Sequence, residues 1–298
     1  MRVIALVTLF HPKQDHALHI AEYARQCDLV FLCDNSGTDS SSLFSDIKNC
    51  LYIRNPDNLG LSRAFNIALS PKCFAWQDED YVLFFDQDSE IAPNHVRSLI
   101  DEYKKIVTTG VAVGALGPVF FNSSTGRTDI PRLREVITPE TFSCDALITS
   151  SMLTTYSNLK RVSFWNEGIF LDYADWDLCW RLRSSGLSIL MTNAVVLRHA
   201  SGIGEQHVCG LRVLDEIPVR RYYQVRDLLK LLQKFYMPRR WRHALGFVKK
   251  LVLQTILLDR RSLRLYYTYL GVRDFFQKIN GKLEEKNDNP VGKKALPL

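Results

Sequence analysis

The stretch Asp80-Tyr81-Val82-Leu83-Phe84-Phe85-Asp86-Gln87-Asp88-Ser89 decides how this chain folds. Its unbroken apolar and aromatic run has the length and composition of a strand that is buried on both faces. Two carboxylates, Asp86 and Asp88, follow directly. Ligands of open α/β sheets bind outside the carboxyl ends of the strands. The sequence therefore predicts that both aspartates stand at the mouth of a cleft.

The two aspartates could bind a metal ion. If the chain stays extended, side chains two residues apart point to the same side of the strand. Together, Asp86 and Asp88 would offer hard oxygen ligands to Mg²⁺ or Mn²⁺, and the ion would also bind phosphate oxygens. In the alternative interpretation, Asp86 caps the next helix and Asp88 is a solvated turn residue. The Asp-x-Asp pattern alone does not separate the two.

Strands alternate with helices before this stretch, which favours a mostly parallel α/β sheet with helices on both faces. Apolar runs predict strands over residues 2–10, 29–33 and 51–54, and helical spacing predicts helices over 17–24 and 61–69. Asp34 follows the second strand in a turn-rich loop. It could accept a hydrogen bond from the N–H of a pyrimidine base, or it could serve as a turn former or helix cap.

The loop before residue 61 carries a second candidate site. Asn58 and Gly60 precede the predicted helix. A glycine lets the backbone approach a ligand closely, and a helix N-terminus attracts phosphate. Arg63 could add a cation for a diphosphate, although an arginine at such a position is more often solvated.

A second acidic cluster contains Asp172, Asp175 and Asp177. Apolar spacing after Asp175 predicts a helix that ends at Gly186, and acidic residues in a first turn could simply complement the helix dipole. Three carboxylates exceed what capping requires, so one of them could act as a general base. Short strands are predicted over residues 146–148, 188–191 and 194–197. His199 follows the last strand and could be a metal ligand or a hydrogen-bonded structural residue.

Composition limits the class of protein. A chain of 298 residues can form one large domain or a domain with an appendage. Its seven cysteines include no Cys-x-x-Cys pair, which argues against a disulfide framework or a cysteine zinc site and favours a reducing compartment. The N-terminal residues are expected to form a strand rather than a secretory signal, and no apolar run is long enough for a membrane span.

The charge is divided unevenly along the chain. Residues 216–298 contain 19 Lys and Arg against 7 Asp and Glu, whereas residues 1–215 contain 19 against 25. We therefore expect an acidic body over 1–215 and a basic helical region with a loose tail over 216–298, with a separate role for each. Apolar residues at helical spacing in the second region could pack on the domain, contact an anionic membrane surface, or do both.

Several motifs occur in the order found in inverting GT-A glycosyltransferases. They are Thr8-Leu9-Phe10-His11-Pro12, Asp34-Asn35-Ser36, Asn58-Leu59-Gly60 with Asn66, Asp86-Gln87-Asp88, Asp172-Tyr173-Ala174-Asp175-Trp176-Asp177-Leu178 with Arg181, and His199. Over nearly its full length, the chain resembles the bacterial rhamnosyltransferase branch of that family. Arg221-Tyr222-Tyr223 with Arg226, and Gly271-Val272-Arg273-Asp274, are similar to the C-terminal region of that branch.

The resemblance implies a GT-A (Rossmann-like) fold, with a nucleotide-sugar-binding and catalytic domain over 1–215 and a C-terminal helical region over 216–298. It also implies transfer of L-rhamnose from dTDP-L-rhamnose to a lipid-linked polysaccharide such as O-antigen, at the cytoplasmic face of the plasma membrane. An inverting transfer needs one carboxylate as general base. Asp175 occupies that position, and Asp172 is the other candidate because Ala174 stands where the family often has Glu. Asp177 would then be structural and pair with Arg181.

The remaining roles follow from the same resemblance. Asp34 would bind the base, Asp86 and Asp88 would hold Mg²⁺ or Mn²⁺ and the diphosphate, and His199 would be a further metal ligand. The expected substrate-binding residues are Thr8, Asp34, Asn35, Asn58, Gly60, Arg63, Asp86 and Arg181.

Two alternatives stay open. The same fold could use a UDP-hexose donor. In a different class, the chain would be a non-catalytic membrane or nucleic-acid adaptor on an inactive α/β body. An acidic body disfavours nucleic acid, and the sequence makes no prediction about oligomeric state.

Overall fold

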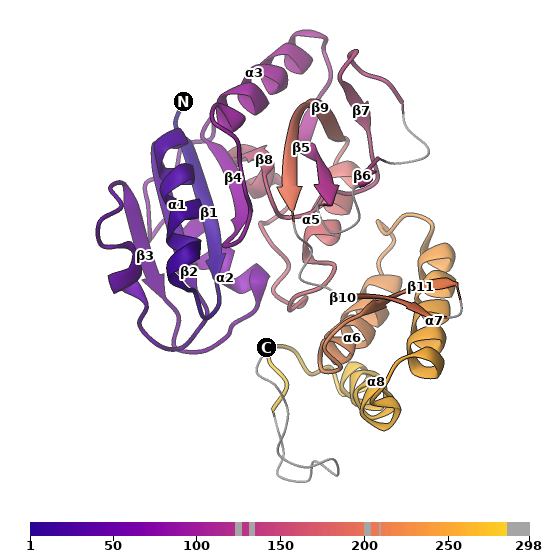
Figure 1. Ribbon diagram of the computed structural model, residues 1–298. Coiled ribbons are helices and arrows are strands. Elements are labelled where there is room, and N and C mark those ends of the chain that lie inside the picture. Colours follow the sequence, from indigo (N-terminus) through magenta and orange to yellow (C-terminus); the bar gives the residue numbers. More distant parts are fainter. Residues whose placement is uncertain (123–126, 131–134, 200–203, 209, 285–298) are drawn as a thin grey trace. The chain divides into compact units, whose positions relative to one another are not determined.

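The computed structural model describes residues 1–122, 127–130, 135–199, 204–208 and 210–284 (Figure 1). Within these limits the chain forms two compact units. The first comprises Met1–Glu167 and Ala174–Ala200, and the second comprises Gly168–Tyr173 and Ser201–Leu298. The second unit therefore includes a hairpin that precedes residue 216 and a short segment just before Asp175. The assignment of separate roles to 1–215 and 216–298 stays a prediction.

The first unit is an α/β domain. Its strands are β1 (Val3–Leu9), β2 (Leu29–Asp34), β3 (Cys50–Arg54), β4 (Tyr81–Asp86), β5 (Val113–Asn122), β6 (Arg127–Asp129), β7 (Thr141–Ser143), β8 (Met152–Thr155) and β9 (Ser188–His199). Its helices are α1 (Gln14–Gln26), the 3₁₀ turn η1 (Ser41–Phe44), α2 (Leu61–Leu69), α3 (His95–Thr108), α4 (Tyr156–Arg161) and α5 (Ala174–Ser184).

These strands form one nine-stranded sheet in the order β3-β2-β1-β4-β8-β5-β9-β7, with β6 paired to β5. Strands β3, β2, β1 and β4 are mutually parallel, as are β5 and β9. Strand β8 pairs antiparallel with both β4 and β5 and thereby joins the two parallel groups. The predicted mostly parallel sheet of a GT-A fold is confirmed.

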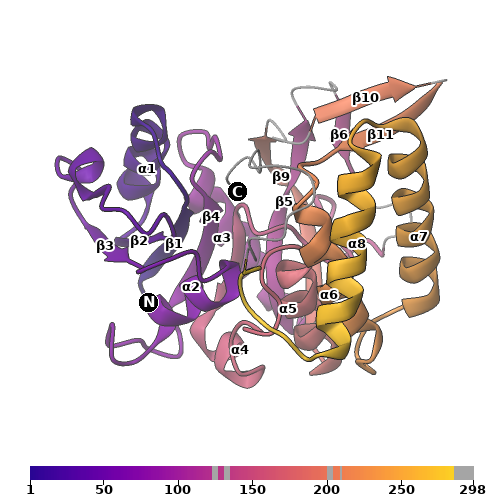
Figure 2. The same ribbon diagram turned by 90° about the horizontal axis from the view of Figure 1, so that it is seen from below.

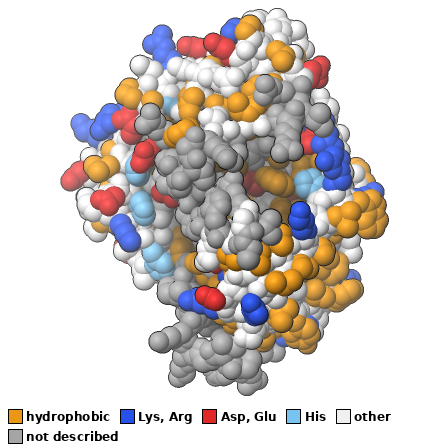
Figure 3. All heavy atoms as spheres, turned by 45° about the vertical axis from the view of Figure 1, so that its right-hand side comes forward, with side chains coloured by type: hydrophobic (Ala, Val, Ile, Leu, Met, Phe, Trp, Pro, Cys, Tyr) orange, Lys and Arg blue, Asp and Glu red, His pale blue; other side chains and the backbone are white. Residues whose placement is uncertain are grey.

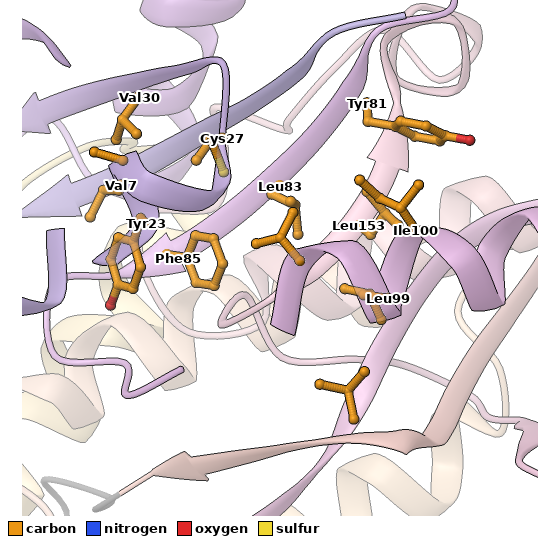
Figure 4. Close-up of a cluster of buried hydrophobic side chains, with 14 of the residues drawn as sticks. Val7, Tyr23, Cys27, Val30, Tyr81, Leu83, Phe85, Leu99, Ile100 and Leu153 are labelled. Atoms are coloured by element: carbon orange, nitrogen blue, oxygen red, sulfur yellow. The ribbon is translucent and has the colours of Figure 1, made fainter. Parts of the chain in front are cut away.

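The buried β4 run is covered on both faces because successive side chains alternate across a strand. Leu83 and Phe85 face α1 and α3 (Figure 4), and Tyr23 of α1 stacks on Phe85 with ring centroids 4.4 Å apart. Phe84 points to the opposite face, where it packs against Phe65 of α2 at 4.8 Å. Both layers are apolar, which fixes the register of the strand.

Two sequence-based expectations about strands are wrong. Residues 146–148 form no strand: the Leu147 amide donates to the Cys179 sulfur at 3.4 Å, and its side chain fills the space beside Gly117. Residues 188–191 and 194–197 belong to one strand, β9, whose pairing with β5 shifts register between Pro118 and Val119. The irregular pairing falls at residues 192–196 of β9, and in the sequence these residues look like a break between two strands.

The described part of the second unit contains a hairpin and three helices (Figure 2). Its elements are β10 (Gly204–Val208), β11 (Leu211–Asp215), α6 (Arg220–Leu232), α7 (Arg240–Leu257) and α8 (Arg261–Phe276). Helices α6 and α8 share a core in which the Tyr222 hydroxyl donates to Asp274 at 2.8 Å. In the described part of the chain, no helix combines the length and apolarity that a bilayer crossing requires.

Candidate active site

Three predicted site residues lie at the carboxyl ends of adjacent parallel strands. In the sheet register, Thr8 of β1 pairs with Asp86 of β4, and Leu9 of β1 pairs with Asp34 of β2. Neighbouring strands lie about 4.8 Å apart. The structure therefore brings Thr8, Asp34 and Asp86 to one edge of the sheet, where α/β folds bind their ligands.

The two aspartates of the Asp-x-Asp motif differ in environment. Strand β4 ends at Asp86, and a turn follows in which the Ser89 amide approaches the Asp86 carbonyl at 3.4 Å. The chain therefore does not stay extended through Asp88, so the condition under which both side chains would point to one side of the strand is not met. Asp86 is half-buried and accepts a hydrogen bond from the Ser150 hydroxyl, whereas Asp88 is exposed. The Tyr23 hydroxyl bonds the main-chain carbonyls of Ser89 and Asp86 and so holds the turn.

Hydrogen bonds tie the loops after β1, β2 and β4 together. The Gln87 side-chain amide accepts from the Phe10 N–H at 2.8 Å and donates to the Phe10 carbonyl at 3.2 Å. The His11 N–H donates to the Ser36 hydroxyl at 2.7 Å. Side-chain hydrogen bonds therefore join the three loops at the edge of the sheet where the donor is predicted to bind.

Asp34 is completely buried. Its carboxylate accepts from the Ser36 N–H at 2.8 Å, from the Ser36 hydroxyl, and from the Tyr52 hydroxyl at 2.5 Å. Burial and this bond to Asp34 raise the pKa of Tyr52 to about 12, so its hydroxyl stays a donor. These contacts orient Asp34 in the loop, and its recognition of a base stays a prediction.

The loop before α2 is held by Asn35 and Asn58. The Asn35 amide donates to the Gly60 carbonyl at 3.2 Å, and the Asn58 side chain accepts from the Gly60 N–H at 3.0 Å. Gly60 has a φ of 81°, a backbone conformation that residues other than glycine rarely adopt. The predicted helix after Gly60 is confirmed, and Arg63 lies exposed in its first turn.

The second acidic cluster spans two units of the chain, with Asp175 and Asp177 in the first unit and Asp172 in the second. Asp175 lies half-buried in the first turn of α5, and its carboxylate accepts from the Trp176 N–H at 2.8 Å. Asp177 is buried and pairs with Arg181 at 2.7 Å, which confirms the expected pair. The Arg181 guanidinium also donates to the Phe164 carbonyl at 2.7 Å. Together, these two bonds join helix α5 to the chain around Phe164 and so have a structural role.

Asp172 belongs to the second unit, where α6 holds it. The Arg220 guanidinium donates to both carboxylate oxygens, with nitrogen–oxygen distances of 2.7 to 3.0 Å. The same segment is fixed by the Phe170 N–H, which donates to Asp227 at 2.8 Å, and by stacking of Phe170 on Tyr223. A fork of this kind fixes a carboxylate in one orientation.

The chemistry of Asp86 and Asp88 fits a hard divalent cation. Among the described residues, no group of three or more His, Cys, Asp or Glu side chains is placed to hold a metal. A pair of carboxylates suits Mg²⁺ or Mn²⁺ when a ligand supplies further oxygens. The side chain of His199, the third expected metal ligand, lies outside the described residues, although its backbone ends β9.

Sequence reasoning did not identify Ser150, Tyr23 or Arg220 as part of these arrangements. Ser150 and Tyr23 are 64 and 63 residues away from Asp86 along the chain, and Arg220 is 48 residues away from Asp172. Tyr23 did carry a signal, because it continues the apolar face of α1. Ser150 and Arg220 carried none, since a single serine or arginine has no pattern that points to a distant partner.

Comparison with known proteins defines the class to which this fold and strand-end arrangement belong. The model of the family "Glycosyl transferase family 2" matches residues 17–165, which is half of the chain. The protein therefore belongs to glycosyl transferase family 2 and is a glycosyltransferase with a GT-A-like fold. The matched region contains Asp34, Asn58, Gly60, Asp86 and Asp88.

One curated relative is the dTDP-rhamnosyl transferase RfbF of Shigella flexneri, which is 25% identical over 254 residues, covering 79% of this chain and 81% of the relative. A crystal structure of GalNAc-T7 with UDP, GalNAc and Mn²⁺ superimposes with a TM-score of 0.52 at 13% identity. That match covers 67% of this chain but only 43% of GalNAc-T7, and it shows the likeness of the fold.

Proposed function

We propose that the protein is an inverting rhamnosyltransferase that moves L-rhamnose from dTDP-L-rhamnose to a lipid-linked glycan acceptor. The observation that carries the proposal is the register that aligns Thr8, Asp34 and Asp86 at one sheet edge, in a member of glycosyl transferase family 2. The similarity to a dTDP-rhamnosyl transferase, which extends over 79% of the chain, supports the choice of donor.

The donor would bind at this edge. Asp34 would meet the pyrimidine base, while Asn35, Asn58 and Gly60 would shape the loop beside it, and Arg63 would approach the diphosphate. Asp86 and Asp88 would hold Mg²⁺ or Mn²⁺, which when bound neutralises charge on the leaving diphosphate. GalNAc-T7, which shares the fold, has a structure with UDP and Mn²⁺, and this supports a divalent ion.

Asp175 is the proposed general base, and it would take the proton of the acceptor hydroxyl as that oxygen attacks the anomeric carbon. Asp172 is the weaker candidate because Arg220 occupies both of its oxygens. A carboxylate whose two oxygens both accept from one guanidinium has its hydrogen-bonding directions taken up, so it is poorly placed to meet an acceptor hydroxyl. Asp175 lies in the first turn of α5, where its carboxylate accepts from the Trp176 N–H.

The acceptor would be a growing surface polysaccharide such as O-antigen, carried on a lipid at the cytoplasmic face of the plasma membrane. The excess of 12 positive charges in residues 216–298 supports work at an anionic surface. A UDP-hexose donor is the second candidate within the class, because both nucleotides offer a pyrimidine and a diphosphate.

The test is donor binding and slow donor hydrolysis by the purified protein, neither of which needs an acceptor. Calorimetry with dTDP-L-rhamnose, UDP-glucose and UDP-galactose, each with and without Mg²⁺ or Mn²⁺, would identify the donor. We expect metal-dependent binding of dTDP-L-rhamnose. Preference for a UDP-hexose would replace the donor, and a folded protein that binds no donor would favour the non-catalytic adaptor.

A further inference from the structure

Helix α7 exposes a continuous apolar stripe. Its members are Trp241 (77% exposed), Leu245 (71%), Val248 (56%), Val252 (49%) and Ile256 (57%). Successive members are three or four residues apart, so they lie on one face of the helix along its whole length. We call these five residues the α7 stripe. In Figure 3, hydrophobic side chains gather in the lower right of the view, with Lys and Arg side chains beside them.

The opposite side of α7 attaches to its own unit through polar contacts. Of the residues of α7, all of which are described, only Gln254 is buried. Its side chain donates to the Leu214 carbonyl of β11 at 2.8 Å and accepts from Arg221 of α6 at 3.0 Å. Arg221 also donates to Thr255 at 2.7 Å. The Phe247 ring also meets Tyr173 of the same unit, with ring centroids 6.4 Å apart. An ordinary surface helix packs its whole apolar face inward, whereas α7 leaves the α7 stripe exposed.

The stripe is bordered by cations. Arg242 and Lys249 each follow a member of the stripe by one residue, which places them about 100° around the helix, along one edge. Both side chains are exposed. Between Asp227 and Asp259 the chain carries seven Lys and Arg and no Asp or Glu. One edge of the apolar surface therefore carries positive charge, without acidic residues nearby in the sequence.

We propose that α7 lies in the headgroup region of an anionic membrane, with the α7 stripe facing the acyl chains. This deepens the membrane setting proposed above by assigning the docking surface, and it rests on that setting. An exposed apolar face with Lys and Arg at its edge and Trp at one end is the pattern of an interfacial helix. Helix α8 offers a second exposed stripe with the same spacing, formed by Leu265, Tyr269, Val272 and Phe276.

The charge favours lipid over a second copy of the chain as the occupant of this surface. Two copies that met on the α7 stripe would bring Arg242 and Lys249 of each toward cations of the other, and like charges across an interface oppose association. Anionic headgroups instead complement both side chains. Because no described helix is long and apolar enough to cross a bilayer, α7 would lie on the membrane surface.

The experiment is co-sedimentation of the full chain with two kinds of vesicle, one of phosphatidylcholine alone and one of phosphatidylcholine and phosphatidylglycerol in equal parts. The test variant is Trp241→Ser/Leu245→Ser, and a second variant, Arg242→Glu/Lys249→Glu, reverses charge at the edge. The matched control is Leu18→Ser, because Leu18 of α1 is 70% exposed, as Leu245 is at 71%, but lies in the other unit.

We expect binding to the anionic vesicles that weakens with salt, and a loss of at least about tenfold in affinity for each α7 variant. Leu18→Ser should bind like the unaltered protein. Hydrolysis of the donor without vesicles should be unchanged in all variants, so a failed donor assay and a failed docking surface are distinguishable. Absence of binding to anionic vesicles, or equal binding by the α7 variants, would overturn the proposal. So would a stable dimer that only Trp241→Ser/Leu245→Ser dissociates.

Discussion

At the scale of single residues, the surroundings of Asp86 are compatible with the role of metal ligand that we propose for it. Ser150 donates a hydrogen bond to one oxygen, and Tyr23 holds the main chain of the turn that follows. Ser150 thus orients the side chain and Tyr23 the main chain, and both of these donors are uncharged. The exposed Asp88 then adds a second carboxylate that can adjust to the ligand.

Replacing Asp175 with Asn should separate catalysis from binding. We expect kcat for transfer to fall by about 10²- to 10⁴-fold, the usual contribution of a general base, while donor affinity stays unchanged in calorimetry. The comparison variant is Asp172→Asn. It should retain most of the transfer activity and lose about 1 kcal/mol of unfolding free energy, because its ion pair with Arg220 is only partly buried. Full transfer activity in Asp175→Asn would remove Asp175 from the base role.

His95 should make stability depend on pH. Its Nε2 lies 2.7 Å from the Ser151 hydroxyl, its Nδ1 has no partner among the described residues, and burial lowers its pKa from 6.5 to about 4. Between pH 6.5 and pH 4, His95 is therefore mostly protonated in the unfolded chain and mostly neutral in the folded protein. Stability from this group is present above pH 6.5 and is lost as the pH falls toward 4, by about 3 kcal/mol.

The measurement is urea unfolding at a series of pH values for the unaltered protein and for His95→Asn. Carboxylates also titrate in this range, so the comparison uses the difference between the two proteins. That difference should shrink as the pH falls from 6.5 to 4. A difference that does not vary with pH would show that His95 titrates normally in the folded state.

At the scale of elements, the two glycines inside the C-terminal helices should respond to alanine in opposite ways. A Cβ on Gly271 of α8 would lie 2.8 Å from the Tyr222 carbonyl oxygen and 2.9 Å from Cβ of Val225, both on α6. A Cβ on Gly246 of α7 would meet nothing within 4 Å. Gly271 thus permits close contact between two helices, whereas Gly246 only weakens its helix.

We expect Gly271→Ala to lower the unfolding free energy by about 1–3 kcal/mol through overpacking. Gly246→Ala should raise it by up to about 1 kcal/mol, the difference in helix propensity. Chemical unfolding of both variants beside the unaltered protein measures the two changes. Equal effects of one sign would contradict the close approach of α6 and α8.

At the scale of the whole molecule, the donor should stabilise the folded chain only when the metal site is intact. With Mg²⁺ and dTDP-L-rhamnose at a hundred times its Kd, binding should add about 2.7 kcal/mol to the unfolding free energy. Removal of the metal with EDTA, or Asp88→Ala, should abolish this increase while the unliganded protein unfolds as before. Thermal unfolding with each combination of donor, metal and variant measures the effect, and an increase that survives EDTA would count against the site.

Features that depend on neighbouring residues could be predicted from the sequence, whereas features that depend on contacts between distant residues could not. The buried run of β4 and the helix after Gly60 depend on neighbouring residues, and both were predicted. Residues 146–148 look like a strand, but they form a loop because Leu147 packs against Gly117 and Cys179, which are distant in sequence. In the candidate site, Asp86 was predicted from its own motif. Its partner Ser150 was not, since only the folded sheet brings them together.

Gln87 shows how the sheet edge can end at two different points on neighbouring strands. A side-chain amide carries one donor and one acceptor, as a peptide group does. By bonding both main-chain groups of Phe10, Gln87 supplies one more rung to the β1–β4 ladder after the backbone of β4 has turned away. Strand β1 ends at Leu9, so these bonds join the first residue beyond β1 to the first residue beyond β4, while the backbone after Asp86 turns and leaves Asp88 exposed. Glutamate at this position would keep the acceptor but lose the donor, and it would set a third negative charge between the two aspartates. In the motif Asp86-Gln87-Asp88, the middle residue therefore makes the contact with the chain after β1, and the two flanking residues supply the carboxylates.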